Sequence, residues 1–180
     1  MINRVANFEK VSVKQFIKDY KEIFGDEIFP SVLAKYDCKT IDEYLSLIWD
    51  NIELPTRSTT KSAGHDFRCP FDIDIYKSHP ITIPTGIRCV IEDGWHLQIV
   101  PRSSMGFNYE MRLVNTVGVL DGDYYYADNE GHIKAKIDVK HTLKLKRGDK
   151  FVQGIFVPYG ITIDDDVTAI RTGGIGSTGR

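Results

Sequence analysis

The sequence predicts a mainly β protein that carries a small α-helical segment at its N-terminal end. From Pro55 onward, short runs of β-branched and aromatic residues are divided by glycine, proline and aspartate, a pattern typical of many short strands. Before Pro55, apolar residues recur at helical spacing behind two capping sequences. Strand spacing alone therefore predicts an all-β barrel or jelly roll, and the N-terminal pattern predicts helices in front of it.

The N-terminal segment is expected to form two clear helices with a shorter one between them. A Ser-x-x-Gln capping box opens an amphipathic run over residues 12–24, and Gly25 ends it. Pro30 begins a short helical turn that runs to Tyr36. A second cap, Thr-x-x-Glu at residues 40–43, opens the other clear helix. The apolar faces of these helices are expected to pack on their own chain, with another subunit or another protein as the alternative.

The rest of the chain is expected to form strands, because its apolar runs are short and are bounded by turn residues. The expected strands are residues 71–75, 81–83, 87–91, 95–100, 133–139, 142–145, 151–157 and 161–163. The helical periodicity of the N-terminal segment does not continue into this part, which is why a single all-β unit is expected here.

Length, composition and charge are those of an ordinary soluble globular protein. The 180 residues, 42% of them hydrophobic and 27% charged, suffice for one domain and a small addition. The net charge of -2 and the pI near 6.2 argue against nucleic acid or an anionic membrane as a partner. No apolar run approaches the ~18 residues of a membrane span and no signal-peptide pattern opens the chain, so a cytoplasmic location is expected. Cys38, Cys69 and Cys89 lack metal-ligand spacing and are expected to be reduced thiols.

Residues 115–124 place polar side chains inside an otherwise strand-like apolar run. Gly118 and the Asp-Gly-Asp sequence at 121–123 are turn residues, so a hairpin is expected with Asp121 at its mouth. A carboxylate there can act as a general base on water, and an aromatic residue after the turn can stack on a flat or sugar-like ligand. The alternative for this stretch taken alone is a surface hairpin with solvated aspartates.

Five segments resemble, in order, the signature motifs of the trimeric dUTP pyrophosphatase (dUTPase) family. They are Ala-Gly-His-Asp at 63–66, Pro-Arg-Ser-Ser-Met-Gly at 101–106, Gly-Val-Leu-Asp-Gly-Asp-Tyr at 118–124, Gly-Asp-Lys-Phe-Val-Gln at 148–153 and Arg-Thr-Gly-Gly-Ile-Gly-Ser-Thr-Gly at 171–179. An ordered set of five is a far stronger signal than any one of them. The resemblance covers roughly residues 52–180.

The resemblance implies a jelly-roll-like β-barrel of the dUTPase type over residues 52–170. The helices become an N-terminal extension, residues 1–51, and residues 171–180 become a flexible glycine-rich tail that closes over the active site. It also implies a homotrimer whose active sites are shared between subunits.

The activity implied by the resemblance is the hydrolysis of dUTP to dUMP and pyrophosphate, with Asp121 activating the water that attacks the α-phosphorus. Magnesium (Mg2+) is the implied cofactor, bound to the triphosphate and held through water by Asp66. The residues implied to contact the phosphates are Arg102, Ser103, Ser104, Gln153, Arg171, Gly176, Ser177 and Thr178. Guanidinium and hydroxyl groups of this kind are suited to phosphate oxygens.

The nucleoside would be bound by a second set of residues. The residues implied to contact uracil and deoxyribose are Asn115, Gly118, Val119, Leu120, Tyr124 and Ile175. The amide of Asn115 offers a paired donor and acceptor to the edge of a pyrimidine. Tyr124 is implied to pack on the deoxyribose and to leave no room for a 2'-hydroxyl, so the substrate would be a 2'-deoxynucleotide.

Three positions depart from the family pattern. His65 replaces the aromatic or aliphatic residue that is more usual there. Ser104 stands where the family commonly has glycine, and Ile175 stands where it usually has the phenylalanine that covers the uracil ring. Residues 125–132 exceed the minimal pattern and are expected to form an extended loop. Two other functions stay open: a dCTP deaminase, which shares this fold, and a regulatory binding protein of the dUTPase fold with residues 1–50 as its recognition element.

Overall fold

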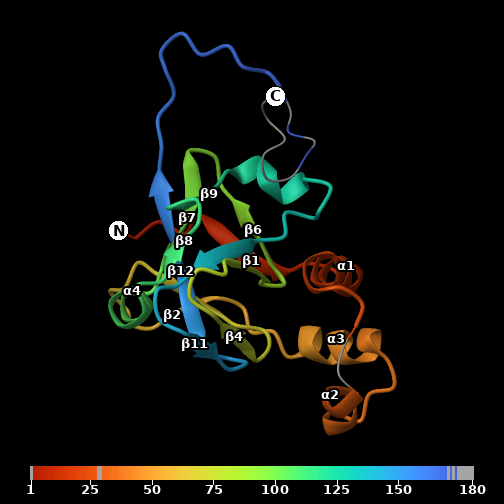
Figure 1. The fold of residues 1–180 in the computed structure, drawn as a ribbon. Helices are drawn as coiled ribbons and strands as arrows, with labels where there is room; N and C mark the ends of the chain where they lie inside the picture. The colour runs from red at the N-terminus through yellow and green to blue at the C-terminus, as the bar shows by residue number, and fades with distance from the viewer. Residues whose placement is uncertain (1, 28–29, 170, 172, 174–180) are drawn as a thin grey trace.

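Antiparallel β-strands form the body of the molecule (Figure 1). The computed structural model describes residues 2–27, 30–169, 171 and 173. Its strands are β1 (Ala6–Lys10), β2 (Thr56–Arg57), β3 (His65–Arg68), β4 (Ile73–Ile75), β5 (Ile81–Pro84), β6 (Ile87–Ile91), β7 (Trp95–Pro101), β8 (Arg112–Leu113), β9 (Gly118–Leu120), β10 (Lys134–Asp138), β11 (Leu143–Leu145) and β12 (Lys150–Pro158). The predicted mainly β fold class is confirmed, and each expected strand except 161–163 has a counterpart.

The largest sheet has the strand order β2-β3-β12-β7-β9, with the nine-residue β12 in its middle. β12 pairs with β3 on one side and with β7 on the other, and β9 pairs with the far side of β7. The other sheets are β5-β10-β8, β11-β4 and β1-β6. Four of the five segments that resemble family motifs lie on or next to strands of the largest sheet, so the fold gathers them from across the sequence.

The three expected helices are present as α1 (Val13–Phe24), α2 (Pro30–Lys35) and α3 (Ile41–Asp50). Both expected caps are formed: the backbone N–H of Gln15 donates to Ser12 Oγ over 3.1 Å, and that of Glu43 donates to Thr40 Oγ1 over 3.1 Å. Such caps satisfy N–H groups that the first helical turn leaves without partners, and this is why the boundaries were predictable from sequence.

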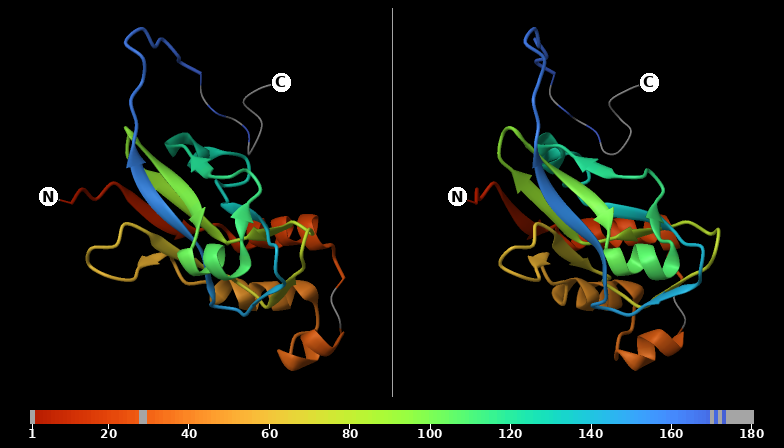
Figure 2. Two further views of the ribbon diagram at one scale, coloured as in Figure 1. Left: turned by 60° about the vertical axis from the view of Figure 1, so that its left-hand side comes forward. Right: turned by 90° about the vertical axis from the view of Figure 1, so that its left-hand side faces the viewer.

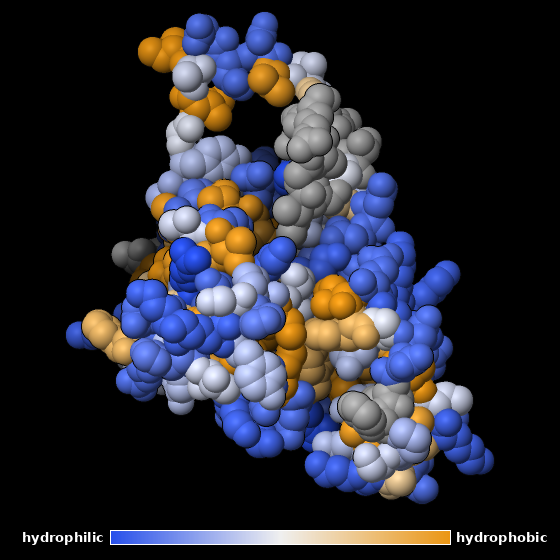
Figure 3. Space-filling model, in the orientation of Figure 1, coloured by the Kyte–Doolittle hydropathy of each residue, from blue (hydrophilic) through white to orange (hydrophobic). Residues whose placement is uncertain are grey.

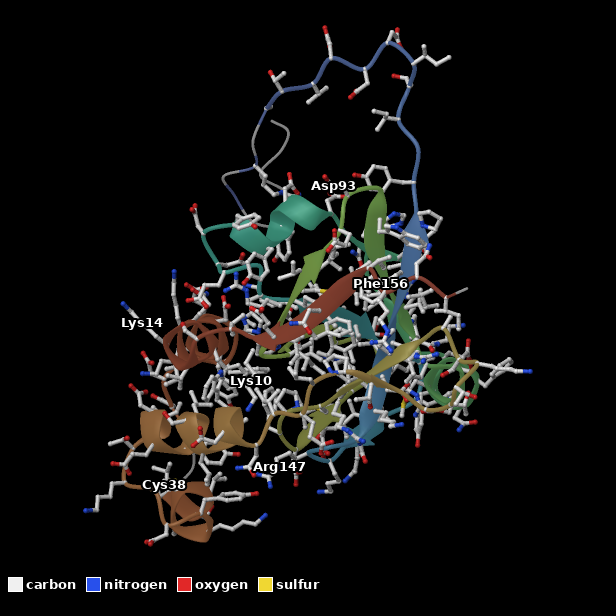
Figure 4. The ribbon with its side chains drawn as sticks, turned by 180° about the vertical axis from the view of Figure 1, so that it is seen from behind. Lys10, Lys14, Cys38, Asp93, Arg147 and Phe156 are labelled. Carbon is white, nitrogen blue, oxygen red and sulfur yellow. The ribbon has the colours of Figure 1, made fainter. Side chains whose placement is uncertain are left out.

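The N-terminal segment also contains β1, which the sequence did not predict, and β1 pairs antiparallel with β6. The helices therefore lie in a loop of the β body, between β1 and β2, and we call residues 11–55 the helical insert. Lys10, labelled in Figure 4, joins its two ends: its Nζ donates to the carbonyl oxygens of Trp49 over 2.9 Å and Asp50 over 3.0 Å. The division of the chain at residue 51 stays a prediction.

The helical insert packs on its own chain, as expected. Phe16 of α1 is fully buried, and it belongs, with the buried residues of α3, to the same apolar core as the buried apolar residues of the strands. Tyr20 and Phe24 of α1 both meet the ring of Phe71, at centroid distances of 5.3 and 5.5 Å. α2 is different, because it buries no residue. Figure 2 shows α1 against the strands, with α2 farthest from them.

Two short helices occupy places where turns or loops were expected. The Pro-Arg-Ser-Ser sequence does not form an isolated turn but leads into the helix α4 (Ser103–Tyr109). Residues 122–126 form the 3-10 helix η1 (Gly122–Tyr126), so the expected extended loop at 125–132 begins with regular structure. In the part of the chain that the structure describes, no helix is long and apolar enough to cross a membrane.

The strand expected at 161–163 is wrong: the chain leaves β12 as an arm without regular strand pairing, residues 159–169 (Figure 1). A period-two apolar run becomes a strand only where another strand completes its hydrogen-bonded ladder, and none of the described residues pairs with residues 161–163. The apolar side chains of the arm are exposed, and Figure 3 shows them standing away from the body. They are Ile161, Ile163 and Val167.

Candidate active site

One pocket, of about 490 Å³, contains most of the residues expected to hold the nucleoside. The expected residues that line it are Asn115, Gly118, Val119, Leu120, Tyr124 and Arg171. We call this cavity the nucleoside pocket. Residues of β5, β7 and β10 line it, together with residues from β8 to η1. Ile23 of α1 and Lys134 of β10 also line it, and neither was singled out from the sequence.

The chain reverses before β9, at residues 114–117, and not at the Asp-Gly-Asp sequence as expected. Leu113 and Thr116 form an isolated bridge, and Thr116 takes the left-handed conformation with φ of 68°. β9 then pairs with β7, where a Cβ on Gly118 would lie 3.2 Å from the Cβ of Ile99. Asp121 follows as the residue that precedes η1. The carboxylate of Asp121 thus projects from the start of a short helix rather than from a hairpin turn.

Tyr124 is buried in the wall of the nucleoside pocket and is held at its hydroxyl by two hydrogen bonds. Its OH donates to the backbone oxygen of His132 over 3.0 Å and accepts from Asn129 Nδ2 over 2.9 Å. Burial raises the pKa of the Tyr124 phenol. The ring is therefore neutral and fixed in orientation at neutral pH.

Arg171 closes one end of the pocket. Its Nη1 lies 3.2 Å from Asp123 Oδ1 and 3.6 Å from Asp121 Oδ2, and its guanidinium lies 5.5 Å from the centroid of the Tyr124 ring. The Arg171 side chain is only 13% exposed, whereas that of Asp121 is 59% exposed. The carboxylate of Asp121 is consequently open to water and to a ligand while it lies beside a cation.

A second group of polar residues surrounds Asp66 on β3. Asp66 is 6% exposed and accepts from Arg102 Nε over 2.8 Å, from Lys150 Nζ over 2.7 Å and from Ser58 Oγ over 2.7 Å. Burial alone would raise the pKa of the Asp66 carboxyl, but the hydrogen bonds from Lys150 and Ser58 and the charge of Arg102 lower it below its usual value. We call Asp66, Arg102, Lys150 and Ser58 the Asp66 cluster.

Lys150 and Ser58 were not expected from the sequence. The only signal for them is indirect, because a carboxylate on a buried strand needs cationic or hydroxyl partners. With two cations and one carboxylate, the charged side chains of the Asp66 cluster carry a net charge of +1, in a chain whose overall charge is -2.

Gln153 lies opposite Asp66 across the β3–β12 pairing and opposite Val100 across the β12–β7 pairing. Its Nε2 is 3.4 Å from the backbone oxygen of Pro101, a long hydrogen bond. A Cβ on Gly64 would overlap the Gln153 side-chain oxygen. The small residue expected to allow close approach before Asp66 thus makes room for Gln153.

Ser103 and Ser104 are the first two residues of α4 and are both exposed. Helical backbone is open to any L-residue, so serine in place of glycine at 104 creates no conformational conflict. Arg102 precedes α4 and turns its side chain back to Asp66.

The nucleoside pocket and the Asp66 cluster lie on the same sheet but are apart within one chain. Asp66 on β3 and Gly118 on β9 are separated by β12 and β7, which amounts to roughly 14 Å at the usual strand spacing. Four of the expected ligand contacts lie outside the described residues. These are Ile175, Gly176, Ser177 and Thr178.

The described residues contain no group of three or more His, Cys, Asp or Glu side chains that could hold a metal ion. Cys38, Cys69 and Cys89 are free thiols. Burial raises the pKa of Cys69 and of Cys89 to about 12, so neither is a reactive thiolate at neutral pH.

The sequence matches the family described as dUTPase over residues 50–179. The deoxyuridine 5'-triphosphate nucleotidohydrolase of Lactococcus lactis is 35% identical over 133 residues, which covers 71% of this chain and 89% of that protein. The protein of the same name from Haemophilus ducreyi is 33% identical over 161 residues, covering 83% of this chain and 99% of that one.

Solved structures give the same answer. The dUTPase of Streptococcus mutans superposes with a TM-score of 0.56 at 36% identity, over 62% of this chain and 89% of that chain. A dUTPase from phage phi11 of S. aureus, described with the coordination of a structural Mg(II) ion, superposes with a TM-score of 0.55 over 67% of this chain and 92% of its own. At 17% identity, the phage structure speaks for the fold alone.

Proposed function

The chain belongs to the dUTPase family, and from that premise we propose that it hydrolyses dUTP to dUMP and pyrophosphate. The observation that carries the proposal is the nucleoside pocket, which joins Asn115, Tyr124 and the β9 backbone in one cavity next to the exposed carboxylate of Asp121. A binding module would need the cavity but not an exposed carboxylate at its edge.

The nucleoside is bound through shape and hydrogen bonds. The amide of Asn115 pairs with the edge of uracil, and backbone groups of Val119 and Leu120 complete the contacts. The Tyr124 ring lies under the deoxyribose. Because both hydrogen bonds of its hydroxyl are made inside the protein, the ring cannot move aside for a 2'-hydroxyl, and UTP is rejected.

The phosphates are bound by the Asp66 cluster and the residues next to it. Arg102 and Lys150 supply positive charge, Gln153 supplies an amide donor, and the exposed hydroxyls of Ser103 and Ser104 supply further donors. Arg171 and the tail residues Gly176, Ser177 and Thr178 close over the triphosphate from the other side. These contacts stabilise the negative charge that develops on the oxygens during the reaction.

In the chemical step, Asp121 accepts a proton from a water molecule, and the water oxygen attacks the α-phosphorus. The bond between the α-phosphorus and the oxygen that bridges to the β-phosphorus breaks, and pyrophosphate leaves with that oxygen. Arg171 now pairs with Asp121 and Asp123. A triphosphate carries more charge than these two exposed carboxylates, so we expect Arg171 to exchange them for phosphate and to free Asp121 for the water.

Magnesium fits this site as a part of the substrate complex rather than as a resident ion. Asp66 is the one carboxylate of the Asp66 cluster. A carboxylate has about four lone-pair positions that can accept hydrogen bonds. Three of those of Asp66 accept from Arg102, Lys150 and Ser58. The remaining position is suited to a hydrogen bond from metal-bound water. The metal would supply charge neutralisation on the triphosphate.

We infer a homotrimer with composite sites. One subunit would give residues 115–124, a second would give Arg102 and Gln153, and a third would give the tail. Two features support this arrangement: the separation of the two residue groups across the sheet, and the apolar residues of the arm, which are exposed in a single chain. The free cysteines support a reducing, cytoplasmic location.

Product analysis tests the function directly. Purified protein is incubated with dUTP, dCTP, UTP and dTTP in the presence of Mg2+, and pyrophosphate and ammonia are both measured. We expect pyrophosphate from dUTP at a rate far above the other three. Ammonia from dCTP would instead indicate a deaminase, and binding of dUTP without turnover would indicate a regulatory protein.

A further inference from the structure

A buried group of polar side chains joins the helical insert to the nucleoside pocket. At its centre is Asp19 of α1, which is 1% exposed. Its carboxylate accepts from His132 Nδ1 over 2.5 Å, from Lys134 Nζ over 2.7 Å and from Gln15 Nε2 over 2.9 Å. His132 and Lys134 lie more than a hundred positions from Asp19 in the sequence, and only the fold brings them next to it. Gln15 lies one helical turn before Asp19 on the same helix. We call Asp19, Gln15, His132 and Lys134 the Asp19 cluster.

The hydrogen bonds fix the protonation state of His132. The backbone N–H of Gly86 donates to His132 Nε2 over 2.8 Å, so this nitrogen carries no proton. Nδ1 must then carry the proton and donate it to Asp19 Oδ2. His132 is fully buried, and burial lowers its pKa more than the charge of Asp19 raises it, in agreement with a neutral ring.

Three contacts lead from the Asp19 cluster to the nucleoside pocket. The backbone oxygen of His132 accepts from the hydroxyl of Tyr124, and this bond helps to fix the ring that is proposed to face the deoxyribose. Lys134 lines the pocket while its Nζ is held by Asp19. Ile23, one helical turn after Asp19, lines the pocket directly.

We propose that α1 is a part of the nucleoside site, and that Asp19 and His132 are positioning residues that hold Tyr124 where it excludes a 2'-hydroxyl. The proposal rests on the proposed function, because it assigns to the Asp19 cluster the selectivity between dUTP and UTP. The helical insert then takes part in substrate selection, which a separately folded N-terminal extension would not do.

Attachment of the helix does not require the Asp19 cluster. α1 is already held by Phe16, Tyr20 and Phe24, which are apolar contacts that stabilise without a desolvation cost. A buried carboxylate between a lysine and a histidine costs desolvation energy, and well-packed apolar side chains in its place would attach the helix equally well. What it does contribute is geometry, because each of its hydrogen bonds has a defined direction.

The loss of Asp19 should act on Tyr124 through His132. Without the carboxylate, the fully buried His132 Nδ1–H loses its acceptor and the partly exposed Lys134 Nζ loses its ion-pair partner, so the ring and main chain of His132 must move to find another acceptor. A misplacement of about 1 Å can change rates about 100-fold, so a small displacement of Tyr124 is expected to alter how strictly it excludes the 2'-hydroxyl.

The test compares Asp19→Ala with Glu22→Ala. Glu22 is an exposed carboxylate on the same helix, and it pairs with Lys18 at 3.9 Å. Among the described residues it makes no hydrogen bond or ion pair to the Asp19 cluster, so the control removes the same charge and leaves the hydrogen bonds of the cluster in place. The readout is the ratio of kcat/KM for dUTP to kcat/KM for UTP, measured beside Tm. We expect Asp19→Ala to lower this ratio about tenfold or more, the usual cost of a misplaced positioning group. Glu22→Ala should keep the parental ratio.

A double variant shows whether the effect passes through Tyr124. Tyr124→Phe removes the hydroxyl that bonds to His132, and we expect Asp19→Ala to have little further effect on the ratio in that background. If Asp19→Ala lowers Tm and leaves the ratio at the parental value, the Asp19 cluster only attaches the helix, and the inference is overturned. If Asp19→Ala does not fold, Asp19→Leu, which removes the acceptor of His132 Nδ1–H and fills the space of the carboxylate, gives the same comparison.

Failure of the proposed function would give a different experimental result from failure of this inference. A parent protein that releases no pyrophosphate from dUTP contradicts the proposed function, whatever the variants do. The inference is then decided by calorimetric titration with dUMP and UMP: an unchanged ratio of their affinities in Asp19→Ala would overturn it, and a lowered ratio would support it.

Discussion

Gly64, the residue before β3, lies beside Gln153 of β12, and the side chain of Gln153 fills the space that a Cβ on residue 64 would need. The amide of Gln153 also lies near the backbone of Pro101, at the end of β7. The absence of a side chain at residue 64 therefore fixes the direction in which Gln153 points, on the strand next to Asp66.

Gly64→Ala should lower the turnover of dUTP roughly 10- to 100-fold, because Gln153 is forced out of its place while the sheet stays intact. Stability should change little, since the clash falls on the end of a flexible side chain. The measurement is steady-state kinetics beside thermal unfolding. Ala63→Ser adds one heavy atom at the exposed neighbouring residue and serves as the control. The double variant Gly64→Ala/Gln153→Ala gives the contradicting outcome. If its loss of turnover equals the combined losses of the two single variants, residue 64 does not act through Gln153.

The helices of the insert could be predicted almost to the residue, because caps and helical periodicity are local signals. β1 could not: of its five residues only Phe8 is buried, so no alternation marks it as a strand. The residues at 161–163 do alternate, yet they form no strand, since pairing requires a partner that local sequence does not reveal. Local rules therefore found the helices, whose hydrogen bonds are internal, and the strands with clear alternation. They did not reveal whether a distant segment pairs with residues 6–10 or with residues 161–163.

The residues of the candidate site also fall into two groups, those that the local sequence indicates and those that it does not. Asn115 and Tyr124 lie within one motif-like stretch, and the structure brings them into one pocket. Asp19 and His132 belong to no motif, and their contact spans 113 positions. The one local sign was a pair of polar residues, Gln15 and Asp19, four positions apart beside the apolar face of α1. A buried carboxylate on such a face requires partners, but the sequence does not say which ones.

Asp121→Asn should lower the turnover of dUTP by about 10²- to 10⁴-fold, the usual contribution of a general base, while nucleotide binding is kept. Asp123→Asn is the matched control. Asp123 Oδ1 lies 3.2 Å from Arg171 Nη1, and Asp121 Oδ2 lies 3.6 Å from it. The control therefore removes an equal charge beside Arg171 but leaves the proposed base in place. We expect a far smaller loss in Asp123→Asn. Equal losses in the two variants would mean that the carboxylates act by holding Arg171, and the assignment of the base would be wrong.

The stability of the protein should fall in mildly acid solution because of His132. Its pKa in the folded protein lies below the ordinary value of 6.5, so between these two values the unfolded chain binds the proton more readily. The contribution of His132 is therefore complete above pH 6.5 and is lost as pH falls through the folded pKa. The groups around the ring are Asp19 and Gly86 N–H, which hold the neutral form in place, with Lys134 and Glu130 nearby.

Denaturant unfolding at a series of pH values measures this loss. His132→Gln does not titrate, so the difference in unfolding free energy between parent and variant should shrink as pH falls below 6.5. Other titrating groups are common to both proteins and cancel. A difference that stays constant from pH 7.5 to pH 5 would show that His132 keeps the same charge in the folded and the unfolded states.

Removal of the helical insert should have different effects according to whether β1 is kept. Replacing residues 12–51 with a short Gly/Ser linker is geometrically feasible, because Trp49 Nε1 donates to the backbone oxygen of Val11 over 2.8 Å and the two ends of the insert meet there. This variant uncovers the surface under α1 and α3, including Phe71. Its free energy of unfolding should fall by about 3–6 kcal/mol, the cost of exposing two large apolar side chains.

Deleting residues 1–51 also removes β1. The deletion therefore takes away the partner strand of β6 and the cover that Phe8 gives to Phe67 and Phe156. We therefore expect the deletion to be less stable and less soluble than the linker variant in thermal unfolding and size-exclusion chromatography. If the deletion matches the parent in both measurements, the insert with β1 is an independent module, and the view that it completes the β body is wrong.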